Sequence, residues 1–112
     1  MNPIKAKFTP DLIIALENIM KDFARWEVAT TDQKVAKSIL VEVAEKIHTR
    51  YRKITKSSDL FTAKKTISIE LKFYELVHLL IFIKVRMDNI DRVSKTYNDF
   101  LKFINEYEKS IV

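Results

Sequence analysis

The chain has 112 residues, a formal net charge of +5, and neither cysteine nor glycine. A single domain over residues 1–112 is expected, because domains commonly hold about 100–150 residues. The lack of glycine disfavours hairpins, sandwiches and glycine-rich phosphate loops, and the lack of cysteine excludes disulfides, thiolate metal sites and cysteine nucleophiles.

The first predicted helix covers about residues 10–27. Thr9 is a suitable cap, Pro10 fits the first helical position, and Asp11 lies where the helix dipole favours an acid. The apolar residues that follow recur at helical spacing, at Leu12, Leu16, Ile19, Phe23 and Trp26.

A second helix is predicted from the polar break at residues 29–32 to about Ile54. Thr30, with Gln33 three residues later, has the form of a capping box. The apolar residues of this segment form one narrow stripe, at Ala36, Leu40, Val43, Ile47 and Ile54.

Two more helices are predicted in the second half of the chain. Residues 55–59 form a polar break with Ser57 or Ser58 as the cap, and a helix follows over about residues 60–86. Asp88 can cap a fourth helix, whose apolar residues are Ile90, Val93, Tyr97, Phe100, Leu101, Ile104 and Ile111. Short connections between four amphipathic helices predict an all-α fold, an antiparallel up-down-up-down four-helix bundle. The alternative is that the last two helices fuse into one rod, which would force oligomerisation.

Positive charge is concentrated at one bend of this predicted fold. Residues 46–66 contain seven bases and a single acid, whereas the rest of the chain has thirteen bases and fourteen acids. The seven bases are the candidate nucleic-acid-binding residues: Lys46, Arg50, Arg52, Lys53, Lys56, Lys64 and Lys65. The helix dipole accounts for bases at the end of the second helix but not at the start of the third. We therefore expect a positive knob that contacts phosphates, and a plain solvated surface is the competing interpretation.

Both histidines follow a glutamate by three positions, at Glu45-x-x-His48 and Glu75-x-x-His78. Paired motifs of this kind hold di-iron centres in some helical bundles. In the predicted bundle, however, the two motifs lie roughly 18 Å apart along the helix axis. We therefore expect no metal and no cofactor. Because no other catalytic constellation is present, we also expect that the protein is not an enzyme.

The third predicted helix is apolar almost all round over residues 76–85. A bundle helix buries only one stripe, so a second covering surface is needed. We expect an interface with another copy of the chain or another partner, formed by Leu79, Ile81, Phe82 and Phe103; a self-covered monomer is the alternative. The segment spans ~15 Å and is too short to cross a membrane. With no signal-peptide pattern at the N-terminus, a cytoplasmic protein is expected.

Several features between residues 16 and 111 form a wider pattern. These are the aromatic residues Phe23 and Trp26, the basic run 50–53, an Ala63…Ile67…Leu71 spacing before the apolar residues 76–83, and Tyr97 followed by residues 103–107. This layout resembles the four-helix-bundle proteins of ribosomal-RNA intervening sequences and the related accessory variability determinant (Avd) of diversity-generating retroelements. The resemblance implies a homo-oligomeric ring with a positive surface that binds nucleic acid and a reverse transcriptase.

The leading prediction is a non-enzymatic, oligomeric helical bundle that binds RNA or DNA as an accessory protein to a reverse transcriptase. A structural or protein-interaction module, whose charge only aids solubility, is the first alternative. A small helical subunit of a ribonucleoprotein, such as a CRISPR effector complex, is the second.

Overall fold

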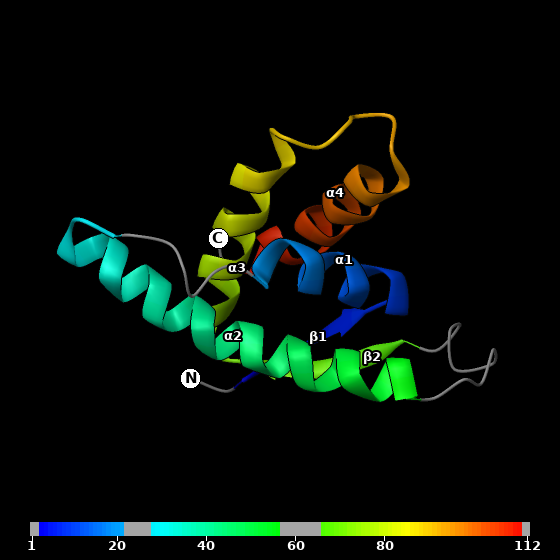
Figure 1. Cartoon of the computed structure of the whole chain (residues 1–112), viewed down its shortest axis with the longest axis horizontal. Coiled ribbons are helices and arrows are strands. Elements are labelled where there is room, and N and C mark those ends of the chain that lie inside the picture. Colours follow the sequence, from blue (N-terminus) through cyan, green and yellow to red (C-terminus); the bar gives the residue numbers. More distant parts are fainter. Residues whose placement is uncertain (1–2, 22–27, 57–65, 111–112) are drawn as a thin grey trace.

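A computed structural model of the chain describes residues 3–21, 28–56 and 66–110 (Figure 1). Within these ranges the chain is mostly helical, with four α-helices and a two-stranded antiparallel sheet. The elements are β1 (Ile4–Phe8), α1 (Pro10–Met20), α2 (Thr31–Lys56), β2 (Ile67–Leu71), α3 (Phe73–Met87), α4 (Lys95–Tyr107) and a short 3-10 helix, η3 (Glu108–Ser110). None of the helices in the described ranges is long and apolar enough to span a membrane.

The first two helices begin where the sequence predicts. The Thr9 hydroxyl accepts a hydrogen bond from the Leu12 N–H at 3.1 Å and so caps α1. At the start of α2, the Gln33 N–H donates to the Thr30 hydroxyl at 3.1 Å, and the Gln33 side chain accepts from the Thr30 N–H at 3.3 Å. The predicted capping box is therefore present. Residues 22–27, where the first helix was expected to continue, lie outside the described residues.

The prediction of four helices is confirmed within the described residues, but the prediction of a purely all-α bundle is wrong at residues 67–71. These residues form β2, which pairs with β1 so that Ile4 is opposite Leu71 and Phe8 is opposite Ile67. Both segments alternate apolar and polar residues with the two-residue period of a half-buried strand. Because the strands are distant in sequence, no hairpin turn joins them, and the lack of glycine is no obstacle.

The third and fourth helices are both shorter than predicted. α3 begins only at Phe73, after β2, and the proposed caps Ser57 and Ser58 lie outside the described residues. α4 begins after Ser94, whose hydroxyl accepts from the Tyr97 N–H at 3.2 Å, and not after Asp88. Residues 88–94 form a turn-rich connection instead. This connection separates α3 from α4, so the alternative of one fused rod is also wrong.

The core lies between the helices and the inner face of the sheet. α1 packs against α2 and α4, and α3 packs against the same two helices. The Phe8 ring of β1 lies 4.9 Å from the Phe103 ring of α4, and the Lys7 N–H donates to the Tyr107 hydroxyl at 2.6 Å. These two contacts hold β1 against α4. The N-terminal turns of α2 extend beyond the other elements in Figure 1, and residues 31–35 are exposed.

The expected oligomer interface is largely in the core of the chain. Leu79, Phe82 and Phe103 are at most 5% exposed, whereas Ile81 is 53% exposed. The physical reason is that α3 has several covering surfaces within one chain, namely α2, α4 and β2. The almost uniformly apolar segment is therefore mostly covered by the chain itself, and a narrower face of α3 remains at the surface.

Candidate nucleic-acid interface

The C-terminal half of α2 carries most of the predicted basic residues that the structure describes. Lys46, Arg50 and Lys53 recur at intervals of four and three, which places them on one side of the helix. Arg50 is half-buried, and Arg52 and Lys53 are exposed. Lys56 is the last residue of α2, whereas Lys64 and Lys65 lie outside the described residues.

The outer face of the sheet adds basic residues that the sequence interpretation missed. Lys5 and Lys7 of β1 are exposed, and they lie opposite Glu70 and Ser68 of β2. Their shared face follows from the alternation of residues 4–8, since successive side chains of a strand point to opposite faces. That alternation was the available signal, and it is only five residues long.

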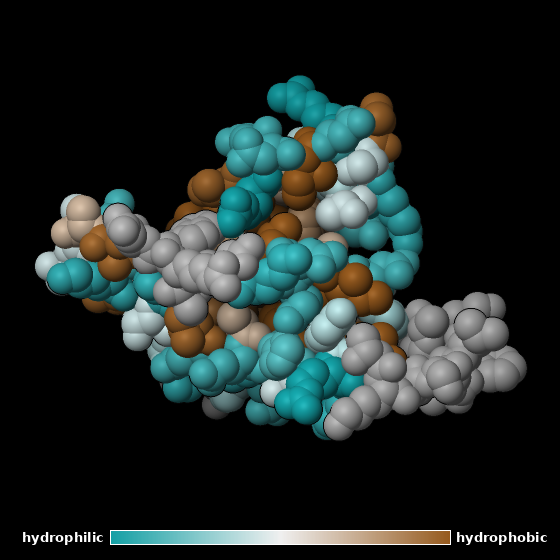
Figure 2. All heavy atoms as spheres, in the orientation of Figure 1, coloured by the Kyte–Doolittle hydropathy of each residue, from teal (hydrophilic) through white to brown (hydrophobic). Residues whose placement is uncertain are grey.

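A groove of about 510 Å³ lies where α2 meets the sheet. Its lining residues come from three elements: Lys5, Lys46, Thr49, Arg50, Ser68, Ile69 and Glu70. The surface of this part of the molecule is largely hydrophilic along the lower edge of Figure 2. We call Lys5, Lys7, Arg50 and Lys53 the basic rim, because they come from the two elements that flank this groove.

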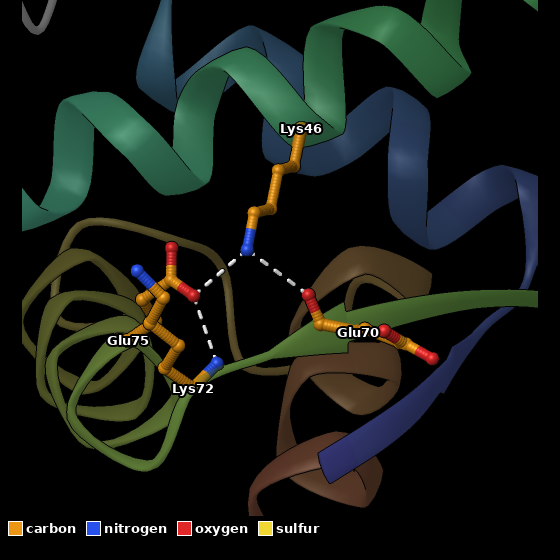
Figure 3. A network of polar contacts seen from close by, with 4 residues as sticks. All are labelled: Lys46, Glu70, Lys72 and Glu75. Carbon is orange, nitrogen blue, oxygen red and sulfur yellow. Dashed lines mark hydrogen bonds and ion pairs between the residues drawn. The ribbon is translucent and has the colours of Figure 1, made fainter. Parts of the chain in front are cut away.

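Lys46 is held by acceptors of the chain itself, as Figure 3 shows. Its ammonium donates to the Glu75 Oε1 at 2.8 Å and to the Glu70 carbonyl oxygen at 3.1 Å. The same Glu75 oxygen accepts the Lys72 N–H at 2.8 Å. The Glu75 side chain is only 1% exposed, so this carboxylate neutralises Lys46. Lys46 therefore fixes α2 against β2 and α3 and adds little net positive charge to the groove.

The basic rim, by contrast, is not neutralised by ion pairs within the described residues. Other bases there do form ion pairs with acids of the chain, for example Lys46, His48, Lys84 and Lys95. Glu70 is the one acid among the groove's lining residues, and it lies opposite Lys5 in the strand register. Of the four bases, Lys5 and Arg50 line the groove itself, and together they outnumber this acid by one charge.

The two histidines do not form a metal site with neighbouring acids in the described part of the chain. His48 contacts the Glu17 carboxylate through Nδ1 at 2.6 Å and so links α2 to α1. His78 is half-buried on α3, and Glu45 is exposed on α2. No group of three or more metal-ligating side chains occurs among the described residues.

Comparison of the chain with known proteins gives no relative from which to transfer a function. No protein-family model, curated protein or solved structure matches it. The groove and the charges around it are therefore the observations on which a functional proposal rests.

Proposed function

We propose that this protein binds nucleic acid through the basic rim and catalyses no reaction itself. The observation that supports the proposal is that Arg50 of α2 and Lys5 of β1 line one groove. Lys53 and Lys7 are exposed bases on the same helix and the same strand. These four residues come from elements far apart in the sequence, and they are not ion-paired within the described residues.

Phosphate groups are the chemical partners that best suit this arrangement. Each lysine or arginine that contacts a phosphate releases condensed counterions, which favours binding at low salt. The planar guanidinium of Arg50 can donate two hydrogen bonds to one phosphate. The Ser68 hydroxyl in the groove is a further donor. Thr49 does not add another, because its hydroxyl already donates to the Glu45 carbonyl oxygen at 2.9 Å.

The composition of the groove favours contacts with the nucleic-acid backbone over contacts with bases. None of its lining residues is aromatic, so they provide no platform on which a base could stack. Phosphate contacts position a protein on a nucleic acid but carry no sequence information directly. We therefore expect binding with little sequence preference, to RNA and to DNA.

The test compares two charge-reversal variants with the same net charge. Arg50→Glu/Lys53→Glu changes the basic rim, and Arg92→Glu/Lys102→Glu changes exposed bases on the α3–α4 connection and α4. Affinity for labelled RNA and DNA is measured over a series of salt concentrations. The rim variant should bind roughly 10–100-fold more weakly at low salt, with a salt slope smaller by about two.

The control variant should lose less than about threefold, as expected when no phosphate contact is removed. Equal losses in both variants would show that overall charge alone drives binding. Unchanged binding in the rim variant would refute the proposal. That result would favour the alternative, a structural or protein-interaction module whose charge aids solubility.

A role beside a reverse transcriptase would have to rest on the resemblance to the Avd group. One of its features was the spacing of Ala63, Ile67 and Leu71 as part of a long helix. Ile67 and Leu71 instead belong to β2. Nucleic-acid binding through the basic rim needs no such helix, and it is the function for which the groove gives direct support.

A further inference from the structure

One side of α3 is apolar and faces solvent. Tyr74, Ile81 and Val85 are 42%, 53% and 58% exposed, and Val77 between them is half-buried. Residues three or four apart share one face of a helix, so these four side chains form a single line, which we call the outer stripe. Apolar side chains are visible at the surface over α3 in Figure 2.

We infer that the outer stripe binds a second copy of this chain, with the two α3 helices antiparallel about a twofold axis at Ile81. A twofold interface is self-complementary, because each residue pair across it occurs twice. This inference is independent of the proposed nucleic-acid binding, since the outer stripe contains no residue of the basic rim.

The spacing of the outer stripe is symmetric about its central residue. Val77 and Val85 each lie four positions from Ile81. In the antiparallel arrangement Ile81 therefore meets Ile81 of the second copy, and Val77 meets Val85. Tyr74 lies seven positions before the axis and Asp88 seven after it, so a tyrosine hydroxyl meets a carboxylate at each end. Apolar residues thus face apolar residues, and polar groups face polar groups.

The charges at the two ends of α3 favour the same direction. Lys72 lies at the N-terminal end and lines a groove with Glu42 of α2. Lys84 and Asp88 lie near the C-terminal end, where Lys84 is half-exposed beside its partner Glu108. In an antiparallel pair, Asp88 lies opposite Tyr74 and therefore close to Lys72, its counter-charge. A parallel pair would instead place Lys84 beside Lys84.

The size of the stripe predicts a weak dimer. α3 has fifteen residues, which corresponds to a length of about 22 Å. Four side chains along this length bury less than the about 800 Å² per partner of a standard stable interface. Self-association should therefore occur with a dissociation constant in roughly the micromolar-to-millimolar range.

The absence of cysteine from the chain allows a direct test of this geometry. Single-cysteine variants of the full chain are oxidised mildly at high protein concentration, and disulfide-linked dimers are followed over time. Ile81→Cys should cross-link quickly, because the twofold axis places the two sulfur atoms side by side. Val85→Cys alone should cross-link slowly, whereas a mixture of Val77→Cys and Val85→Cys should form the mixed dimer quickly.

Val93→Cys is the control for random collisions, since Val93 is 85% exposed on the α3–α4 connection. Cross-linking of Ile81→Cys no faster than that of Val93→Cys would overturn the inference. Rapid self-cross-linking of Val85→Cys would also overturn it, because that result requires parallel helices.

Sedimentation of the wild-type chain gives an independent measurement. The average mass should rise toward twice the monomer mass as concentration increases, and Ile81→Glu should abolish this rise while circular dichroism keeps its helical signal. Val93→Glu should still dimerise. A wild-type chain that stays monomeric at millimolar concentration would refute the inference, whatever its affinity for nucleic acid.

Discussion

Lys46 and Glu75 form an ion pair with a distance of 2.8 Å that joins the middle of α2 to the first turn of α3. Because the Lys46 ammonium also donates to the Glu70 carbonyl oxygen of β2, a single side chain links three elements. The second carboxylate oxygen of Glu75 is buried without a hydrogen-bond partner among the described residues. The position of the groove beside α2 thus depends on a carboxylate that is out of contact with water.

Removal of the two partners of this pair should have unequal effects on stability. Lys46→Met leaves a buried carboxylate without its counterion. Because Lys46 itself is one-third exposed, the free energy of unfolding should fall by about 3 kcal/mol, the low end for a buried pair. Glu75→Gln leaves a lysine that is one-third exposed and can turn toward water, so the loss should be about 1 kcal/mol. Urea unfolding followed by circular dichroism measures both changes.

The double variant serves as the control for this prediction. Because each single substitution already breaks the ion pair, the double variant should be more stable than the sum of the two losses predicts, by about 0.5–3 kcal/mol. Additive losses would mean that Lys46 and Glu75 stabilise the fold separately. A larger loss for Glu75→Gln than for Lys46→Met would contradict the assignment of Glu75 as the more deeply buried partner.

The docking of β1 on α4 can be tested at one hydroxyl group. The Tyr107 hydroxyl accepts the Lys7 N–H at 2.6 Å. Tyr107→Phe removes this acceptor and keeps the ring that lies 4.8 Å from the Phe103 ring. We expect a loss of about 1 kcal/mol in the free energy of unfolding, together with faster amide exchange at Lys7. Tyr97→Phe on the same helix is the control, and it should leave exchange at Lys7 unchanged.

The helix caps predict a second set of stability changes. Thr9 and Ser94 each accept a hydrogen bond from a backbone N–H in the first turn of their helix. Thr9→Ala and Ser94→Ala should each cost about 1 kcal/mol of stability in thermal or urea unfolding. Thr9→Ser keeps the hydroxyl and should lose much less. Equal losses for Thr9→Ala and Thr9→Ser would show that the hydroxyl is not the stabilising group.

The sequence was sufficient to predict the elements whose signals are local. The cap at Thr9 and the box formed by Thr30 and Gln33 fix where α1 and α2 begin, and both are present. The stripe of α2 was also correct, since Leu40, Val43 and Ile47 are buried. In each case the information lies within a few residues, so a helical period and a capping side chain are enough.

The two strands were not predicted because they lie far apart in the sequence, at residues 4–8 and 67–71, and each is short. Five alternating residues at positions 67–71 are too few to outweigh a helical pattern that continues on the C-terminal side. Their stability as a strand comes from pairing with residues 4–8, for example Ala6 opposite Ile69. The short alternation in each segment does not say which other segment it pairs with. Lys5 and Lys7 were missed for the same reason. They lie beside Glu70 and Ser68 only because β1 pairs with β2.

The candidate site was predicted in part for a related reason. Arg50 and Lys53 follow from the concentration of charge on α2, and they remain candidates. The neutralisation of Lys46 was not foreseeable, because it requires Glu75 to approach from α3. The predicted interface on α3 also changed, since α2, α4 and β2 cover most of that helix. Only Ile81 among its four residues stays exposed.

An exposed ion pair between α1 and α4 predicts a dependence of stability on pH. Lys95 contacts the Asp11 carboxylate, and this hydrogen bond, together with the negative charge of Asp11, raises the pKa of Lys95. A raised folded-state pKa means that the pair stabilises the fold fully below the unfolded pKa of lysine. This contribution is lost as the pH rises through the folded-state pKa.

Lys95→Met should therefore melt at a lower temperature than the wild-type chain at neutral pH, and the difference should disappear in strongly alkaline solution. The effect should also shrink at high salt, because both side chains are mostly exposed and the charges are screened. Lys102→Met, at an exposed position on the same helix, is the control and should show no such alkaline change. Thermal unfolding followed by circular dichroism across this pH range measures both. The difference in melting temperature between the wild-type chain and Lys95→Met could instead stay constant with pH. That result would mean that Lys95 stabilises the fold through its methylene groups and not through its charge.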